Sequence, residues 1–279
     1  MINKTYIIAE IGINHNGDMN LAKELIDTAK TSGCDAVKFQ KRTLSEVYTD
    51  EELDKPRESP FGTTNRQQKE GLEFSIEQYV ELEKYTKDLG LEFIISCWDI
   101  PSIHLVEEHL NVDYHKVASA LLTHKKFLKE LVKTGKKLII STGMSDSGDI
   151  HKAVDIVEDN LKYVLACTST YPTKPDEMNL NFITTLKDYY PPHIGIGFSN
   201  HYSGALACHG AVALGAECIE FHITKDRTMY GSDQAASIEH VDTLVDGIRL
   251  LEQMVGNGIK VVYEDEKGIA AKLRQHNTL

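Results

Sequence analysis

The feature that most constrains the fold is a regular alternation of short apolar segments with longer amphipathic ones along nearly the whole chain. The short segments have the length and the β-branched and aromatic content of buried strands: Tyr6–Ile11, Ala36–Gln40, Glu92–Cys97, Tyr114–Ala118, Lys137–Ser141, Tyr163–Cys167, Ile194–Ser199 and Cys218–His222. A helix-like segment follows each of them: Leu21–Thr31, Ile76–Leu89, Ser102–His109, Lys125–Thr134, Ser147–Glu158, Asn179–Tyr189, Gly204–Leu214 and Val241–Val255. Eight strand–helix units in a chain of 279 residues predict an α/β fold, the (β/α)8 TIM barrel.

Local signals agree with these helices and weigh against the main alternative fold. Ser75 precedes Gln78 by three residues, which is the spacing of a capping box. Glycines that would end helices follow four of the segments: Gly33, Gly90, Gly135 and Gly215. The alternative is an open, doubly wound sheet, which usually carries a G-x-G-x-x-G turn after its first strand. The turn here reads Gly-Ile-Asn-His-Asn-Gly and lacks that spacing, so we favour the barrel.

The chain divides into one domain and a tail. Residues 1–256 form the predicted barrel, with a long loop after strand two, and residues 257–279 form a linker-like arm. The loop, Lys41–Phe74, is polar and contains prolines and glycine, which favour shaped turns over a helix. Loops of this length are usually lids, binding loops or disordered. We expect it to cover a site at the barrel mouth, with Arg57 or Arg66 contacting a ligand or a neighbouring subunit.

Composition narrows the classes of partner. The net charge of -12 argues against nucleic acid and anionic membranes. No apolar run approaches the ~20 residues of a membrane-spanning helix, and the first residues do not read as a signal peptide. The five cysteines are scattered without a C-x-x-C pair, as expected for reduced thiols. These observations predict a cytoplasmic protein.

Charged and hydroxyl side chains gather at the predicted C-terminal ends of the strands, where barrels carry their reactive groups. Lys38 and Lys116 lie inside apolar runs, where a cation is costly unless an anion compensates it. For one lysine alone, a structural pair with a barrel glutamate is the simpler interpretation. Two such lysines together with Ser119, Ser141 and Ser199 favour a pocket for a phosphate and a carboxylate.

Two histidines also end neighbouring strands. His201 follows the seventh strand and His222 ends the eighth, and adjacent strands lie ~4.8 Å apart, so their imidazoles could share one divalent cation. Barrel closure would bring Glu10, at the end of strand one, beside them. Spacing alone leaves the metal open, because two histidines lack the stronger signature of three ligands.

Four segments resemble the sialic acid synthases, which are phosphoenolpyruvate-dependent synthases of N-acetylneuraminate and related nonulosonic acids. They are Ala9–Gly17, Val37–Gln40, Ser141–Met144 and Gly197–Ser237. The likeness runs in order from Ile7 to about Ile238. It covers the barrel domain and not the C-terminal antifreeze-like domain of many members, whose linker would begin near the last residue of this sequence.

The resemblance implies a transferase that condenses phosphoenolpyruvate with an open-chain aldose such as N-acetylmannosamine. The products would be a 2-keto-3-deoxy sugar acid and phosphate. The resemblance also implies a homo-oligomer, a dimer or tetramer. His201 and His222 would bind a divalent metal, Mn²⁺ with Mg²⁺ or Co²⁺ as alternatives, and Asp233 would hold a water on that metal.

The resemblance also assigns site residues. Catalytic roles fall to Glu10, Lys38, Lys116, His201, His222 and Asp233. Substrate-binding roles fall to Gln40, Ser96, Ser119, Ser141, Thr142, Ser169, Tyr171, Ser199 and Asn200. Among these, the two lysines with Ser119, Ser141 and Ser199 would hold phosphoenolpyruvate, and Glu10 would orient the acceptor sugar.

Two departures from the family pattern leave alternatives open. Leu121 stands where the family usually has an acidic residue, and Cys97 replaces a hydroxyl that would contact phosphoenolpyruvate. The acceptor could therefore be a different sugar, as in synthases of the KDN or KDO type. A catalytically impaired sugar-phosphate binding protein is a further alternative. A barrel hydrolase with a metal-bound water is disfavoured, because strand one lacks the usual two histidines one residue apart.

Overall fold

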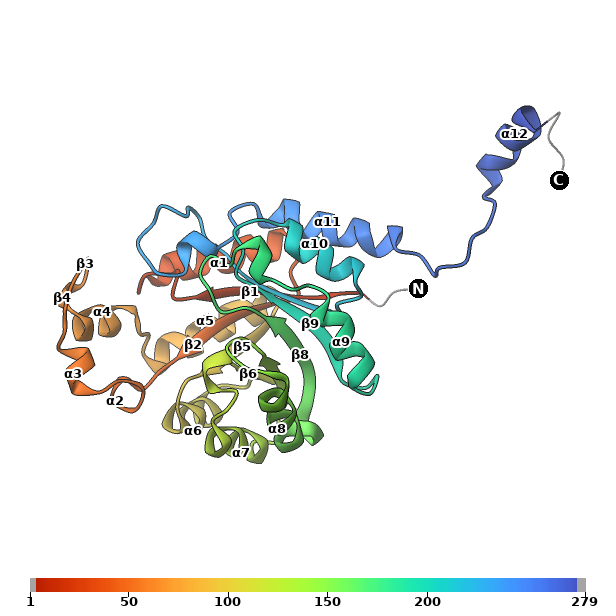
Figure 1. Ribbon diagram of the computed structural model, residues 1–279. Helices are drawn as coiled ribbons and strands as arrows, with labels where there is room; N and C mark the ends of the chain where they lie inside the picture. Colours follow the sequence, from red (N-terminus) through yellow and green to blue (C-terminus); the bar gives the residue numbers. More distant parts are fainter. Residues whose placement is uncertain (1–3, 275–279) are drawn as a thin grey trace.

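The fold is a closed barrel of eight parallel strands, described for residues 4–274 by a computed structural model (Figure 1). Around the barrel the strands follow the order β1-β10-β9-β8-β7-β6-β5-β2. Their bounds are β1 (Tyr6–Gly12), β2 (Ala36–Lys41), β5 (Glu92–Cys97), β6 (Tyr114–Val117), β7 (Lys137–Ser141), β8 (Leu161–Cys167), β9 (Gly195–Asn200) and β10 (Cys218–His222). The predicted (β/α)8 barrel is confirmed.

A helix follows every barrel strand and packs on the outside of the barrel (Figure 1). These helices are α1 (Met19–Thr31), α5 (Ile76–Asp88), α6 (Ile100–His109), α7 (Lys125–Lys133), α8 (Ser147–Val157), α9 (Phe182–Tyr189), α10 (Leu206–Ala213) and α11 (Val241–Met254). The Ser75–Gln78 capping box of α5 is formed as predicted. Gly33 and Gly90, which follow α1 and α5, have φ of +82° and +73°, a conformation that glycine adopts without strain.

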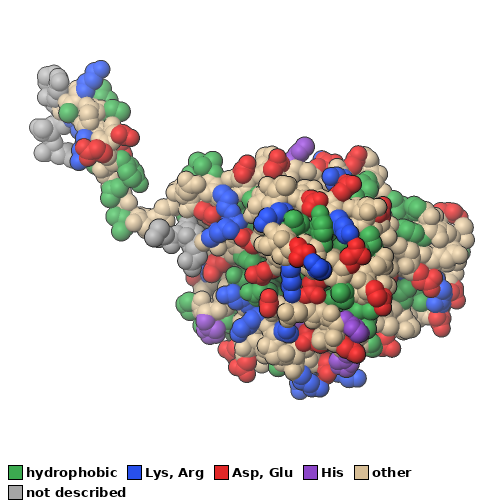
Figure 2. Space-filling model, turned by 180° about the vertical axis from the view of Figure 1, so that it is seen from behind, with side chains coloured by type: hydrophobic (Ala, Val, Ile, Leu, Met, Phe, Trp, Pro, Cys, Tyr) green, Lys and Arg blue, Asp and Glu red, His purple; other side chains and the backbone are tan. Residues whose placement is uncertain are grey.

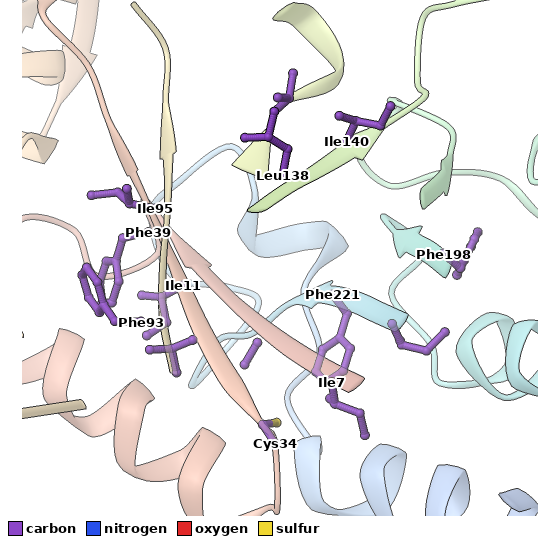
Figure 3. Close-up of a cluster of buried hydrophobic side chains, with 14 of the residues drawn as sticks. Ile7, Ile11, Cys34, Phe39, Phe93, Ile95, Leu138, Ile140, Phe198 and Phe221 are labelled. Atoms are coloured by element: carbon purple, nitrogen blue, oxygen red, sulfur yellow. The ribbon is translucent and has the colours of Figure 1, made fainter. Parts of the chain in front are cut away.

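Two apolar layers hold the barrel together, because successive side chains of a strand point to opposite faces. The larger layer lies between strands and helices, and Phe39, Phe93 and Phe221 are among its side chains (Figure 3). The smaller layer is a cluster built from the alternate residues of six strands: Ile8, Ala36, Ile94, Ile139, Leu165 and Cys218. Two residues further along five of these strands, the side chain on the same face is polar and lines a cavity above this apolar cluster: Glu10, Lys38, Ser96, Ser141 and Glu220.

The segment after β2 is more structured than the predicted loop. It contains α2 (Leu44–Val47), α3 (Asp50–Leu53), a hairpin of β3 (Pro56–Ser59) and β4 (Gly62–Thr64), and α4 (Asn65–Leu72). A partly buried ion pair of 2.6 Å between Lys41 and Glu73 joins its two ends. The segment lies beyond the C-terminal ends of the strands (Figure 1). It is therefore a small folded unit beside the barrel mouth.

The chain leaves the barrel after α11 and ends in a projecting arm, in the region predicted to be a linker. The arm carries α12 (Glu264–Leu273) and extends away from the barrel, on the side opposite the inserted segment (Figure 1). Residues 275–279 of the predicted arm lie outside the described residues. On the face in Figure 2, acidic and basic side chains are interspersed. Within residues 4–274, no helix combines the length and apolarity needed to cross a membrane.

Candidate active site

A cavity of about 220 Å³ opens at the C-terminal ends of the barrel strands. Each of the eight strands, or the turn directly after it, contributes to the wall, as expected for the functional end of such a barrel. The lining residues of this inner cavity are Glu10, Lys38, Gln40, Ser96, Trp98, Lys116, Ala118, Ser119, Ala120, Ser141, Met144, Ser169, Tyr171, Ser199, His201, Glu220 and His222. Most of the predicted site residues therefore meet in one place.

Four buried charges form an ion-pair layer across the inner cavity. Lys38 Nζ lies 2.7 Å from Glu10 Oε2 and 3.8 Å from Glu220 Oε2. Lys116 Nζ lies 3.1 Å from Glu220 Oε1. No side chain in the layer is more than 5% exposed. Both lysines thus have the barrel-glutamate partners that the sequence offered as the simpler interpretation, and the layer is formally neutral without a ligand.

The mutual attraction in this layer keeps Lys38 and Glu220 charged. Burial alone would raise the pKa of Glu220, but Lys116 and Lys38, with hydrogen bonds from Lys116 and Ser199, hold the pKa at about 2. Burial alone would lower the pKa of Lys38, yet Glu10 and Glu220 raise it. The inner cavity therefore presents a charged Lys38 ammonium group and a charged Glu220 carboxylate.

Glu220 is the one member of the layer that the sequence did not assign to the site. It lies between Ile219 and Phe221 in a buried strand, where it reads as part of an apolar run. Its signal was its position two residues before His222, because that spacing places both side chains on the same face of β10. The Ser199 hydroxyl donates to its Oε1 at 2.9 Å and connects it to β9.

The hydroxyl groups of the inner cavity differ in how they are satisfied. Ser96 donates to the carbonyl of Lys116 at 2.9 Å, and Ser119 accepts the Gly143 amide at 3.1 Å. The Ser141 hydroxyl is buried and has no hydrogen-bond partner among residues 4–274. A buried hydroxyl in that state is costly unless a ligand or water completes it. Ser141 is thus the serine most open to a ligand.

Thr142 and Asn200 were predicted to bind substrate, but neither is among the residues that line the inner cavity. Thr142 Oγ1 donates to the carbonyl of Leu165 at 3.1 Å. Asn200 forms two hydrogen bonds with the backbone of Tyr202, at 2.7 and 3.1 Å. These contacts fix the backbone at the ends of β7 and β9, so both residues support the site from outside its wall.

The two predicted metal-binding histidines are neighbours, with ring centroids 5.4 Å apart. His201 Nδ1 lies 2.8 Å from the carbonyl of Thr168. Nδ1 is therefore the hydrogen-bond donor, and Nε2 carries the free lone pair. Burial would lower the pKa of His201, but the Cys167 sulfur and the Thr168 carbonyl raise it. Burial lowers the pKa of His222, although Asp233 opposes the effect, so this imidazole is neutral.

These groups fit a weakly held metal ion. His222 Nδ1 is buried without a hydrogen-bond partner in the described chain, and it lies 3.7 Å from Asp233 Oδ2. An unsatisfied imidazole nitrogen beside a carboxylate is a suitable donor for a divalent ion. Within residues 4–274, however, no three His, Cys, Asp or Glu side chains are arranged as a metal cage. An ion here would need water or substrate to complete its coordination.

A second cavity, of about 280 Å³, adjoins the inner one and shares Gln40, Trp98 and Tyr171 with it. This outer pocket is walled largely by the inserted segment and by loops at the barrel mouth. Its lining residues are Ile13, His15, Gln40, Arg42, Leu44, Tyr48, Lys69, Leu72, Glu73, Trp98, Tyr171, Ser232 and Asp233. The predicted Asp233 and Tyr171 are placed here, whereas Arg42, Tyr48 and Trp98 carried no recognised signal in the sequence.

Gln40 connects the two cavities through hydrogen bonds. Its Nε2 donates to Glu10 Oε1 at 2.6 Å, and its Oε1 accepts a hydrogen bond from the Arg42 guanidinium. The guanidinium in turn stacks over the Trp98 ring at 4.2 Å. Arg66, which we expected to reach a ligand, instead pairs with Asp50 and Asp54 at 2.8 and 3.0 Å on the surface of the inserted segment.

The two residues that depart from the family pattern lie outside both cavities. Leu121 ends a short 3₁₀ turn (Ser119–Leu121) and packs against the larger apolar layer, between strands and helices. It lines a separate surface depression. Cys97 is 1% exposed and belongs to the same apolar layer, while its neighbour Ser96 lines the inner cavity. Neither Leu121 nor Cys97 therefore lines the wall of either cavity.

Comparison with known proteins places this chain in a family. The N-acetylneuraminate-9-phosphate synthase of Mus musculus is 38% identical over 96% of this chain and 76% of its own length. The N,N'-diacetyllegionaminic acid synthase of Campylobacter jejuni is 35% identical over 95% of this chain and 81% of its own length. The crystal structure of the N-acetylneuraminic acid synthetase of Leptospira borgpetersenii superposes with a TM-score of 0.83, at 29% identity, over 98% of this chain and 93% of that one. The NeuB family profile matches residues 25–260, from within α1 to beyond α11, and the chain belongs to the NeuB family.

Proposed function

We propose that the chain is a nonulosonic acid synthase that condenses phosphoenolpyruvate with an N-acetylated aldose. The products would be a 2-keto-3-deoxy sugar acid and phosphate. The names of the mouse, Campylobacter and Leptospira relatives support a synthase of this class. The observation that carries the proposal is the pair of joined cavities, one with two buried lysines and the other with groups that can bind sugar hydroxyls.

The inner cavity is the proposed site of phosphoenolpyruvate. Its phosphate and carboxylate would contact Lys38 and Lys116, since charge-assisted hydrogen bonds are the strongest contacts such groups can form. The unsatisfied hydroxyl of Ser141 would complete one of them. Glu10 and Glu220 hold these lysines in place before the ligand arrives.

In the proposed reaction, C3 of the enolpyruvate attacks the aldehyde carbon of the acceptor, and the aldehyde oxygen takes up a proton. Water adds at C2, the bond between C2 and the phosphate oxygen breaks, and phosphate leaves. The residues supply position and charge compensation. Gln40 and Glu10 are placed to orient the acceptor hydroxyls, because their side chains form a hydrogen bond of 2.6 Å where the two cavities meet.

We propose that a divalent ion, Mn²⁺ with Mg²⁺ or Co²⁺ as alternatives, is held by His201 and His222, with Asp233 beside it. When bound, such an ion would polarise the aldehyde carbonyl as a Lewis acid. The Thr168 carbonyl fixes the ring of His201, and burial keeps His222 neutral, as a ligand must be.

A screen of aldoses with phosphoenolpyruvate, measuring phosphate release and the keto acid formed, tests the proposal. N-acetylmannosamine, its 6-phosphate, a 2,4-diacetamido sugar, mannose and arabinose 5-phosphate cover the acceptor classes. Lys38→Met and Lys116→Met should each raise the KM for phosphoenolpyruvate by roughly 10- to 100-fold, or abolish turnover. The control Lys133→Met, whose side chain is 69% exposed on α7, should retain wild-type kinetics. No phosphate release with any aldose would overturn the proposal.

We also propose a homodimer. Apolar side chains of the arm are exposed although they are large: Val261, Val262, Tyr263, Ile269 and Leu273. Apolar surface of this kind supports association with a second copy. Light scattering should find a dimer for the wild type and a monomer for the double variant Val262→Asp, Ile269→Asp, and a wild-type monomer would contradict it.

A further inference from the structure

A series of polar contacts joins the outer pocket to the ion-pair layer. It begins with the Arg42 guanidinium, which donates a hydrogen bond to Gln40 Oε1. Gln40 Nε2 donates to Glu10 Oε1 at 2.6 Å, and Glu10 Oε2 lies 2.7 Å from Lys38 Nζ. The last three residues line the inner cavity, whereas Arg42 lines the outer pocket and not the inner cavity. Arg42 therefore lies at one end of the series, away from the groups that would react.

The two neighbours of Gln40 fix the orientation of its side-chain amide. A guanidinium has only N–H donors, so the atom that faces Arg42 must be the amide oxygen. The amide nitrogen then faces the Glu10 carboxylate, whose oxygens accept hydrogen bonds. A reversed amide would set oxygen against oxygen at Glu10 and N–H against N–H at Arg42, and both hydrogen bonds would be lost. Arg42 thus determines that Gln40 presents a donor, and not an acceptor, to Glu10.

The backbone of Gly12 closes one side of the Glu10–Gln40 hydrogen bond. Gly12 has a φ of +55°, and a Cβ added there would lie 2.9 Å from Glu10 Oε1 and 3.1 Å from Gln40 Nε2. The bond is therefore packed against the end of β1, where a side chain larger than that of glycine would disturb it. The guanidinium is held in turn by the Trp98 ring, with 4.2 Å between its carbon and the ring centroid.

The Arg42 guanidinium has no carboxylate partner that would give it another role. Within residues 4–274, no carboxylate oxygen lies within 4.0 Å of its nitrogens. Glu73, which lines the same pocket, contacts Lys41 Nζ at 2.6 Å and only the backbone amide of Arg42, at 3.2 Å. The positive charge of Arg42 therefore acts on the amide oxygen of Gln40, and a charged donor at that oxygen strengthens the amide N–H as a donor to Glu10.

From this arrangement we infer that Arg42 is a positioning residue, which acts through Gln40 to hold an amide donor and the Glu10 carboxylate side by side for one hydroxyl of the acceptor. The inference rests on the proposed condensation, in which Gln40 and Glu10 orient the acceptor. Gln40 Nε2 has a second N–H, and a hydroxyl can accept from that N–H while it donates to the carboxylate. An amide free to turn would offer the same hydroxyl two acceptors for part of the time.

A double-mutant cycle in the condensation assay tests whether Arg42 acts through Gln40. Arg42→Met should lower kcat/KM for N-acetylmannosamine about 10-fold or more, since a hydrogen bond to a charged group is lost, and should leave the KM for phosphoenolpyruvate nearly unchanged. In the Gln40→Met background the same substitution should cost nothing further. Arg42→Lys, which can also donate to Gln40 Oε1, should recover most of the loss. An equal loss in both backgrounds would overturn the inference.

The side-chain amide signals of Gln40 separate this inference from the proposed reaction, because they require no turnover. In protein labelled with ¹⁵N-glutamine, the Gln40 pair is the one lost in Gln40→Met. In wild type, its proton bonded to Glu10 should be shifted downfield and slow to exchange with deuterium oxide. Arg42→Met should abolish both properties. Arg42→Lys should keep them, as should the control Arg66→Met, because Arg66 pairs with Asp50 and Asp54 on the surface of the inserted segment.

The combined results distinguish the two proposals. A Gln40 signal pair that is unchanged in Arg42→Met would overturn the positioning role, even in a protein that carries out the condensation. The expected change in this pair without phosphate release from any aldose would retain Arg42 as the residue that orients Gln40 and would overturn the condensation alone.

Discussion

Replacement of Glu220 by glutamine tests the ion-pair layer most directly. The Glu220 carboxylate lies 3.1 Å from Lys116 and 3.8 Å from Lys38, and it accepts the Ser199 hydroxyl at 2.9 Å. Glutamine keeps the shape and an acceptor oxygen for Ser199 but removes the charge. The layer then changes from formally neutral to a net positive charge, and within the described residues Lys116 loses its only carboxylate partner.

The expected loss of stability follows from the burial of the pair. Removing one partner of a buried ion pair costs about 3–5 kcal/mol, because the other charge stays buried without compensation. For a domain of this size, 1 kcal/mol lowers Tm by about 2–4 °C, so Glu220→Gln should melt roughly 6–20 °C below wild type. Phosphoenolpyruvate should recover part of this loss, because its anionic groups would replace the carboxylate beside Lys116.

Thermal unfolding followed by circular dichroism, with and without saturating phosphoenolpyruvate, measures both effects. Glu130→Gln serves as the control, since the Glu130–Lys133 pair at 2.6 Å lies on the surface and exposed pairs contribute little. The same Tm for Glu220→Gln and wild type would refute charge compensation as the basis of the layer. A lower Tm with no added stabilisation by phosphoenolpyruvate would refute its binding at these lysines.

Chelation of metal should abolish turnover and added Mn²⁺ should restore it, because His201 and His222 are the only proposed protein side-chain ligands; full activity in excess chelator would contradict the metal site. Burial lowers the pKa of His15 to about 3, below the ~6.5 of an unfolded chain, so the unfolded state binds the proton more readily and stability is lost as pH falls from 6.5 toward 3. His15→Asn, which can still accept the Gly17 amide, should remove this dependence of ~1.4 kcal/mol per pH unit, and urea unfolding at several pH values would expose an unchanged slope. Replacing Thr49–Asn65 by a short Gly-Ser linker should raise the KM of the acceptor and leave that of phosphoenolpyruvate nearly unchanged, because the neighbouring wall of the outer pocket loses its support; equal effects on both substrates would count against this.

The barrel could be predicted from sequence because its determinants are local. Each apolar strand and each amphipathic helix is recognisable on its own, and a run of eight such units permits few arrangements. The inserted segment could not be predicted in the same way. Its helices and strands are short and polar, and they are held by contacts such as the Lys41–Glu73 ion pair, which joins residues far apart in the chain.

The candidate site shows the same difference between features with local determinants and features that depend on distant parts of the chain. Lys38, Lys116 and the two histidines were found because a polar group at the end of an apolar strand is conspicuous. Glu220 was missed because its meaning depends on which face of β10 points into the barrel. The outer pocket was missed because its cations come from the inserted segment, whose fold had to be known first. Sequence reasoning therefore located most of the inner cavity and, in the outer pocket, only Gln40, Tyr171 and Asp233.

The carboxylates of the ion-pair layer have a consequence for which anions can enter. Glu10 already contacts Lys38 at 2.7 Å, and Glu220 already contacts Lys116 at 3.1 Å. Chloride or acetate would bring one charge and would have to displace a carboxylate that is tethered in place. A ligand with an anionic group at each end can engage both lysines in a single binding event. We therefore expect the two carboxylates to disfavour small monovalent anions and to favour a ligand with two anionic groups.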